Sequence, residues 1–284
     1  MEILESNWQA HLTLGFADDK GTTRLVQRSH VGPLRVQKPL YPEGEHICHA
    51  VVLHPPGGVV GGDHLALTTT VGSEAHAVLT TPGAAKWYKA NGRISRQELT
   101  FTIGDDACLE WLPQESIFFD TADVQLTQTV NLSKTSRYIG CEILCFGRTA
   151  SGESFTSGGL SQQTILRREG KLIWWEQGNL KGGSAAMHSP LGLSGNSVCA
   201  TLLATGKPLS ATLVQTIREE IDSMLGKLGN VEGDFGISQG KSLVVARYLG
   251  TSSEIARRVM LCVWQHVRPE LMGCAAVVPR IWQT

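Results

Sequence analysis

The sequence predicts a mainly β fold with two α-helices near the carboxyl end. Runs of strand-forming residues recur through residues 1–206, and glycines fall between or beside these runs, where turns are expected. Two later segments, about 209–228 and 252–268, instead space their apolar residues at the period of a helix. No linker separates these parts, so residues 1–284 are predicted to form a single domain.

The strands are predicted from alternation and composition. Residues 99–103 and 124–132 alternate polar and mostly apolar side chains, which is typical of a strand with one buried face. Other runs rich in strand-forming residues lie at 75–81, 108–112, 142–146, 163–167, 172–176 and 242–248. A sandwich, a barrel and a β-helix all fit this pattern. Because no exact internal repeat is visible, the residues themselves do not indicate a regular solenoid.

Each helical segment carries an apolar stripe. The first, followed by Gly229 as a stop signal, comprises Leu213, Ile217, Ile221, Met224, Leu225 and Leu228. The second begins with a capping-box pattern at 251–254, ends before Pro269, and comprises Ile255, Val259, Cys262, Val263 and Val267. Both stripes are predicted to face the core, with a partner groove as the alternative. The tail, residues 277–284, is predicted to be a final strand or an arm docked on a partner.

Composition narrows the class of partner. Charged residues make up 18% of the chain, which fits a protein that hides much of its surface in itself or in partners, and equally fits a plain β-rich domain. The net charge of −1 provides no basic excess to neutralise phosphates, so nucleic acid is not an expected partner. No apolar stretch approaches the roughly 20 residues of a membrane span. Seven scattered cysteines, without a secretory signal at the start, predict free thiols in the cytoplasm.

Residues 54–63 contain four glycines and two prolines. Paired glycines allow backbone angles that are closed to other residues, and paired prolines stiffen the entry. A phosphate cradle is one interpretation, but no Gly-Lys-Ser/Thr follows and no dinucleotide-binding glycine pattern is present. The segment is therefore predicted to be a tight structural crossing of backbones rather than a ligand site.

Several residues of metal-binding type cluster nearby. They are His46, Cys48, His49, His54, Asp63 and His64. Imidazole suits nickel and zinc. On a strand, however, an odd spacing points side chains to opposite faces, so transient contacts are favoured over a closed four-ligand site. Cys141 and Cys145 lack zinc spacing and are expected on opposite strand faces.

Catalytic patterns are missing from the sequence. It has no Gly-x-Ser-x-Gly elbow and no His-Glu-x-x-His zinc motif. Together with the missing nucleotide-binding loop, this favours a scaffold over an enzyme.

Six segments, in order, resemble the UreD/UreH family of urease accessory proteins. They are GPLRVQKPLYPEG at 32–44, HPPGGVVGGD at 54–63, TTPGAAKWY at 80–88, EWLPQESIFFD at 110–120, FGRTASGE at 146–153 and PRIWQT at 279–284. Because they run from residue 32 to the end in the right order, the resemblance covers nearly the whole chain.

The resemblance implies a fold and a function. The implied fold is a two-layered, β-helix-like body with two α-helices near the carboxyl end. The implied function is non-catalytic: a urease maturation factor that binds the urease apoprotein and UreF, reaches the GTPase UreG through UreF, and passes Ni²⁺ through an internal passage. No tightly bound cofactor is expected, and the nickel is transient. GTP hydrolysis would belong to UreG.

Such a passage needs spaced, weak ligands. A strong site would trap the ion, and an apolar pore would reject it because burying a charge is costly. The candidates are Asp63, Thr80, Thr81, Glu142 and Glu176. For each, the alternative is a turn cap, a satisfied hydroxyl or a surface carboxylate. Glu142 is the strongest candidate, since a carboxylate inside the strand at 139–146 would otherwise be poorly placed.

Two other functional classes remain as alternatives. A β-rich small-molecule or carbohydrate-active enzyme would need a deep pocket with paired carboxylates about 5–9.5 Å apart. A nickel-storage protein would need a tight site.

Overall fold

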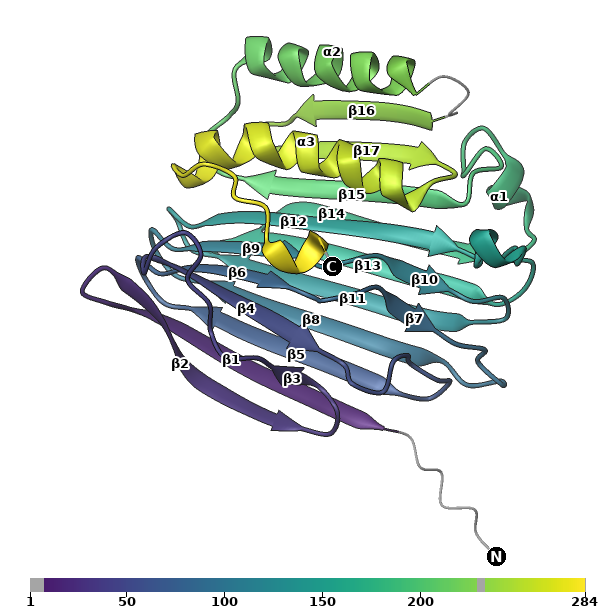
Figure 1. Ribbon diagram of the computed structural model, residues 1–284, viewed down its shortest axis with the longest axis horizontal. Coiled ribbons are helices and arrows are strands. Elements are labelled where there is room, and N and C mark those ends of the chain that lie inside the picture. Colours follow the sequence, from purple (N-terminus) through teal and green to yellow (C-terminus); the bar gives the residue numbers. More distant parts are fainter. Residues whose placement is uncertain (1–7, 229–232, 284) are drawn as a thin grey trace, which may run out of the picture.

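Two β-sheets stacked face to face form the body of the protein, and two long helices cover the outer face of one sheet (Figure 1). The computed structural model describes residues 8–228 and 233–283. The seven-stranded sheet has the order β14 (Lys171–Lys181), β13 (Gly159–Arg168), β11 (Asp123–Leu132), β8 (Ser95–Ile103), β5 (His64–Val71), β1 (Gln9–Asp19) and β2 (Thr22–Val31).

The ten-stranded sheet carries the helical layer. Its order is β16 (Gly233–Gln239), β17 (Leu243–Gly250), β15 (Val198–Thr205), β12 (Arg137–Phe146), β9 (Cys108–Leu112), β6 (His76–Thr80), β4 (Ile47–Leu53) and β3 (Arg35–Val36), with β10 (Ser116–Phe118) and β7 (Ala85–Trp87) branching at β12. The helices are α1 (Ala185–His188), α2 (Ala211–Lys227) and α3 (Ser253–Met272), with short 3₁₀ turns η1 (Thr149–Ser151) and η2 (Arg280–Gln283).

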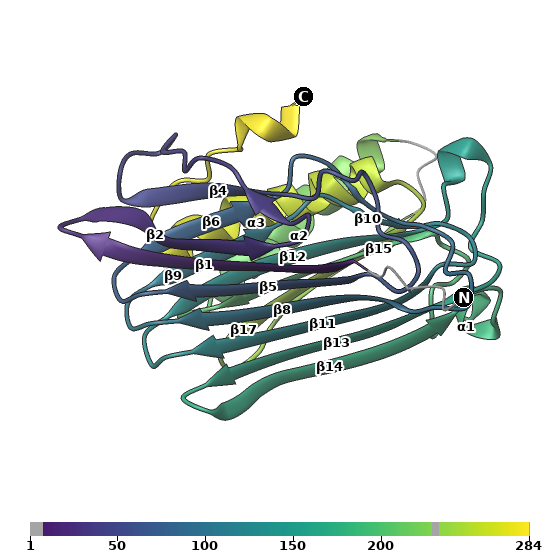
Figure 2. The same ribbon diagram turned by 90° about the horizontal axis from the view of Figure 1, so that it is seen from below.

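The chain passes repeatedly from one sheet to the other. β4, β6, β9 and β12 are parallel neighbours in the ten-stranded sheet, and β5, β8, β11 and β13 are parallel neighbours in the seven-stranded sheet. Figure 2 shows the seven-stranded sheet beside the ten-stranded sheet. Each pass adds one strand to each sheet, so the predicted two-layered, β-helix-like body is confirmed. A parallel stack requires only apolar residues at inward positions, which explains why no exact repeat is needed.

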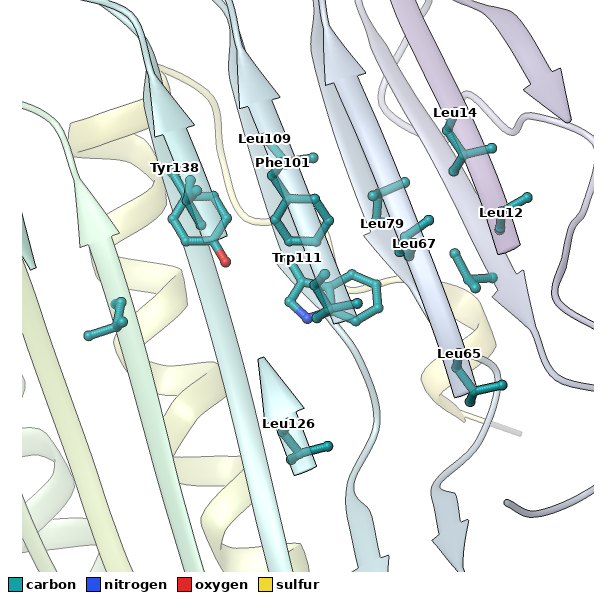
Figure 3. Packing of buried hydrophobic residues seen from close by; sticks show 14 of the residues in the cluster. Leu12, Leu14, Leu65, Leu67, Leu79, Phe101, Leu109, Trp111, Leu126 and Tyr138 are labelled. Carbon is teal, nitrogen blue, oxygen red and sulfur yellow. The ribbon is translucent and has the colours of Figure 1, made fainter. Parts of the chain in front are cut away.

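Alternate residues of the ten-stranded sheet face two different cores. On β12, Tyr138 points between the sheets, where Phe101 and Trp111 of neighbouring strands pack with it (Figure 3). Cys141 and Cys145 point the other way, into the core under α2 and α3. The expectation that these cysteines occupy opposite faces is wrong, because a spacing of four is even. Burial raises the pKa of both thiols to about 12, so both keep their protons and pack within this core.

The apolar stripe of the first predicted helix faces the core, as predicted. Ile217 and Ile221 of α2 are buried, and the other stripe residues pack partly buried against the same cluster. The Ser210 side chain caps α2 by accepting the N–H of Leu213. The predicted stop, Gly229, lies outside the described residues.

The second predicted helix differs from α3 at both ends. Ser252 is the N-cap, accepting the N–H of Ile255, so the capping box does not form and Glu254 instead pairs with Arg258. Pro269 lies inside the helix, which continues to Met272. The extra turn buries Leu271 and Met272 and thereby extends the apolar face.

The tail is not a strand. It forms η2 and packs on this chain, where the Trp282 ring lies 6.1 Å from the Trp264 ring of α3. The Trp282 indole N–H donates to the Thr80 hydroxyl at 2.8 Å. Thr284 lies outside the described residues. None of the helices in the described ranges is long and apolar enough to cross a membrane.

A buried ionic network fastens α3 to the body. Arg268 of α3 is fully buried and contacts two carboxylates, Glu110 on β9 and Glu43 in the loop before β4. His76 shares a hydrogen bond with Glu110, and His49 shares one with Glu43. The network therefore connects two carboxylates of the β-rich body to a helix that lies more than 150 positions later in the sequence.

The glycine-rich segment forms the predicted tight crossing. Val59 donates its N–H to the Lys86 carbonyl and accepts that of Tyr88. A Cβ on Gly61 would lie 1.9 Å from the Ala90 carbonyl oxygen, and one on Gly58 would lie 2.2 Å from the Tyr88 ring. The glycines are needed because another backbone and a ring occupy the space of a side chain.

Gly61→Ala is expected to lower the free energy of unfolding by about 1–3 kcal/mol, because the methyl group would force the two backbones apart. Chemical denaturation measures this. Gly83→Ala is the matched control, since a Cβ there meets nothing within 4 Å, and it should leave stability unchanged or slightly higher. Equal effects of the two changes would contradict the crossing.

Candidate functional site

A cavity of about 220 Å³ lies between the two sheets. Leucines of β5 and β8, together with Trp111, form its apolar wall. Its polar lining consists of His54, Thr81, Lys86, Gln97, Gln114, Ser116 and Glu142. The sparse polar groups in an apolar wall give the cavity a few defined points at which a small polar species can be held.

A second cavity, of about 460 Å³, adjoins the first. Its polar lining consists of Glu142, Gln162, Glu176, Thr201, Asp234 and Arg247. Glu142 and Leu144 of β12 line both cavities. The two spaces therefore meet at this point of the strand, and Glu142 is the carboxylate at the junction.

Strand alternation places Glu142 at the junction. It lies on the same face of β12 as Tyr138 and Leu144, which point between the sheets. Its side chain is half-buried, and the Gln162 amide of β13 donates to its Oε2 at 2.5 Å. The sequence-based reason for singling out Glu142, a carboxylate inside an otherwise apolar strand, thus corresponds to a lining position.

The Glu142 carboxyl holds its proton unusually tightly. Burial raises its pKa to about 7, the negative charge of Glu176 adds to the rise, and the Gln162 hydrogen bond opposes it. Near neutral pH the group is close to half ionised. A cation can therefore displace the proton, and a proton can displace the cation.

Glu176 is the second predicted residue in this region. It lies on β14, lines the second cavity, and pairs with Arg247 of β17 at 2.5 Å. Its effect on the pKa of Glu142 shows that the two carboxylates sense each other across the cavity. The fold thus brings together two candidates that are 34 positions apart in the sequence.

The two predicted threonines have different surroundings. Thr81 lines the first cavity, where its hydroxyl donates to the Gly83 carbonyl and accepts the Gln114 N–H. The Thr80 hydroxyl donates to the Leu112 carbonyl and accepts the Trp282 indole N–H, outside the linings of both cavities. Thr80 therefore holds the tail to the body.

Asp63 is buried in the glycine-rich crossing, also outside the two linings. Its carboxylate accepts the backbone N–H of Trp8 at 3.1 Å and that of Val60 at 3.0 Å. In this position the side chain acts as a turn cap, which is the alternative to a role in the passage. Its charge also acts on His54, where it partly offsets the lowering of the imidazole pKa by burial.

His54 lines the first cavity, although it was not among the residues predicted from the sequence to form the passage. Its Nε2 is buried without a hydrogen-bond partner among the described residues. Burial lowers the pKa of His54 more than the charge of Asp63 raises it, so the imidazole is neutral at neutral pH and can act as a ligand. The available signal was its place beside the paired prolines and glycines. By contrast, His49 is committed to Glu43.

The lining is therefore a set of separated weak ligands. A neutral imidazole, threonine hydroxyls, side-chain amides and three carboxylates occur along two adjoining spaces rather than around one point. Such spacing suits release of a cation more than its retention. The three carboxylates of the second cavity, Glu142, Glu176 and Asp234, are the groups in the two linings from which the enzyme alternative could draw a pair.

Comparison with known proteins places the chain in a family. The family model described as UreD urease accessory protein matches residues 9–283. A protein of Janthinobacterium sp. (strain Marseille) is 57% identical over 278 residues, covering 98% of this chain and 92% of the relative. One of Nitrosospira multiformis is 54% identical over 280 residues, covering 99% of each. Both relatives are named urease accessory protein UreD, and a match of this length and identity leaves one conclusion: the chain belongs to the UreD family of urease accessory proteins.

Proposed function

We propose that this chain is a non-catalytic scaffold of urease maturation that passes Ni²⁺ toward the urease active site through its two adjoining cavities. The observation that carries the proposal is the position of Glu142, which lines both cavities and has a pKa raised to about 7 by burial. A carboxyl of this kind binds a divalent cation by giving up its proton and releases it when the proton returns.

The route follows the polar lining. His54 and Thr81 face the first cavity, Glu142 stands at the junction, and Glu176 faces the second. Each offers one or two ligand atoms, so water completes the coordination of the ion at every step. Asp63 supports the route indirectly, because it holds the backbone beside His54 and contributes its charge there. Thr80 supports it by anchoring η2.

The partners follow from family membership. We propose that the chain binds the urease apoprotein and UreF directly and meets UreG through UreF, with GTP hydrolysis on UreG. All seven cysteines have free thiols, which suits work in the reducing cytoplasm. Recovery of the chain outside the cytoplasmic fraction would contradict that location.

A loading assay tests the proposal. The purified chain alone should hydrolyse neither urea nor GTP, and it should raise the nickel content and activity of apo-urease when UreF and UreG are present. A pull-down should recover it with apo-urease and with UreF. Equal nickel loading when the chain is left out would reject the scaffold. Equilibrium dialysis should show only weak Ni²⁺ binding at the cavity residues, whereas tight binding that Glu142→Gln weakens would favour the storage alternative. Turnover of a glycoside would favour the enzyme alternative.

A further inference from the structure

Three side chains of metal-binding type face one another between α2 and α3. These two helices lie on the outer face of the ten-stranded sheet (Figure 1). They are Glu220 of α2 and Cys262 and His266 of α3. One ligand atom of each lies within 4.8 Å of the others. The three residues belong to neither cavity lining, so nickel passage does not account for the cluster.

The sequence spacing explains how α3 supplies two of the three groups. Residues four positions apart lie on the same side of a helix, one turn from each other, so Cys262 and His266 project together. Glu220 precedes the buried Ile221 of α2 and lies at the border between its buried face and solvent. The cluster thus sits at the edge of the contact between the two helices.

The contacts of His266 decide which of its two ring nitrogens can bind a metal ion. A carbonyl oxygen can only accept, so Nδ1 must donate its hydrogen to the Cys262 carbonyl at 2.9 Å. In the neutral ring, Nε2 then carries a lone pair, and it faces a carboxylate oxygen of Glu220 at 3.2 Å. Two acceptors at that distance need a proton or a metal ion between them. The Nδ1–H contact with a carbonyl is also the arrangement that orients a metal-binding imidazole.

The third group is a thiol held beside the same carboxylate. Cys262 is buried, and burial, followed by the charge and hydrogen bond of Glu220, raises its pKa to about 12. Without a metal ion the sulfur therefore keeps its proton. A thiol-binding metal displaces that proton, so metal affinity should rise with pH.

We propose that Glu220, Cys262 and His266 form a binding site for a divalent transition-metal ion of the zinc type, which clamps α2 to α3. A sulfur, a nitrogen and an oxygen ligand suit borderline ions and disfavour calcium and magnesium. Tetrahedral bonds of about 2.0–2.3 Å place ligand atoms roughly 3.3–3.8 Å apart, so the cluster must contract by about 1 Å. The Glu220 side chain is 55% exposed and free to make that movement, and water takes the fourth position.

Cobalt reports the site directly, because a cobalt–thiolate bond absorbs in the near ultraviolet and a tetrahedral cobalt ion absorbs strongly in the visible. The metal-free full chain, titrated with Co²⁺, is expected to develop both bands at one equivalent and to lose them when Zn²⁺ is added. Zn²⁺ is also expected to raise the melting temperature of the chain, since the ion binds only the folded site.

Three variants make the test specific. Cys262→Ser and His266→Gln should each abolish the thiolate band or weaken Co²⁺ binding at least tenfold, and His266→Gln should also remove the Zn²⁺-dependent rise in melting temperature. Cys274→Ser is the matched control, since Cys274 is half-buried and follows the same helix, and it should keep both signals. Circular dichroism checks folding, and the half-buried His266 provides a readout if the buried Cys262 does not tolerate serine.

Two results would overturn the site. One is the absence of a thiolate band at one equivalent of Co²⁺. The other is a band that survives in the folded His266→Gln protein or disappears in Cys274→Ser, because the metal would then be bound by other residues.

Discussion

Replacing Arg268 with alanine is expected to lower the free energy of unfolding by about 3–5 kcal/mol, the range typical for removal of one partner from a buried ion pair. The guanidinium is fully buried, and its Nε lies 2.9 Å from Oε1 and 3.1 Å from Oε2 of Glu110. Its Nη2 lies 2.9 Å from Oε1 of Glu43. Alanine would leave both carboxylates buried without their cation.

The pKa values of the two carboxyls show how much they depend on this cation and its neighbours. Burial alone would raise the pKa of Glu43, but hydrogen bonds from His49 and Arg268 bring it down to about 2. Burial would likewise raise the pKa of Glu110, and contacts with His76 and Arg268 lower it instead. Both carboxyls are thus held in the charged form inside the protein.

Urea denaturation of the wild-type and Arg268→Ala proteins measures the loss. Arg258→Ala is the matched control on the same helix, because the exposed Arg258–Glu254 pair should contribute only about 0.5 kcal/mol or less. The stabilisation from the lowered pKa of Glu43 is present above its unfolded value of 4.5 and is lost as the pH falls toward 2. Arg268→Ala should flatten that acid-side loss. A destabilisation no larger than that of Arg258→Ala would show that the network contributes little.

Glu142→Gln is expected to reduce nickel loading of apo-urease severalfold while leaving assembly with the partners intact. Glutamine keeps the size of the side chain but removes the charge at the point where the two cavities meet. The ion then crosses the junction without a carboxylate, at the cost of moving a charge through a poorly solvating space. Pull-down of the complex and metal analysis of the recovered urease measure the two properties separately.

The control for Glu142→Gln is Glu98→Gln, which removes an exposed carboxylate from β8 outside the two linings. It should load nickel at the wild-type rate, and equal loading by Glu142→Gln would remove Glu142 from the route.

Asp63→Ala is also expected to lower nickel delivery to apo-urease while leaving the complex intact. Because the Asp63 carboxylate accepts two backbone N–H groups, the free energy of unfolding of the Asp63→Ala protein must be measured together with its nickel delivery.

The pKa of Glu142 also gives its variant a pH signature. A folded-state value of about 7 lies above the unfolded value of 4.5, so the folded protein binds this proton more tightly and loses stability as the pH rises between the two. Glu142→Gln should lack that loss. In the wild type, loading should fall as the pH drops below 7, because the protonated carboxyl is a poor ligand.

Local patterns in the sequence predicted the elements well where one interaction dominates them. The alternation at 124–132 became β11, and the stripe containing Ile217 and Ile221 became the buried face of α2. The paired glycines indicated a crossing, and the structure shows the carbonyl of Ala90 against Gly61. Two errors lie at ends: α3 passes through Pro269, and the tail is a 3₁₀ turn, because tertiary burial outweighs local signals there. A third was the prediction of opposite faces for Cys141 and Cys145, which an even spacing puts on the same face of β12.

The residues of the candidate site likewise fall into those that a local pattern predicts and those that only tertiary contacts decide. A carboxylate inside an apolar strand was enough to single out Glu142, since strand alternation decides which face a side chain takes. Nothing local distinguishes Thr81, which lines a cavity, from Thr80, which anchors Trp282. His54 was visible as a histidine, but its unpartnered Nε2 depends on what surrounds it.

The sequence by itself determined the β-rich class, the two late helices and the family, because periodicity and motif order are properties of neighbouring residues. Only the tertiary structure decided which strands pair, where the two cavities meet, and that Arg268 lies between Glu43 and Glu110. The same holds for Glu220 beside Cys262 and His266. These contacts join residues tens to hundreds of positions apart, and the burial of the intervening chain, rather than any local preference, brings them together.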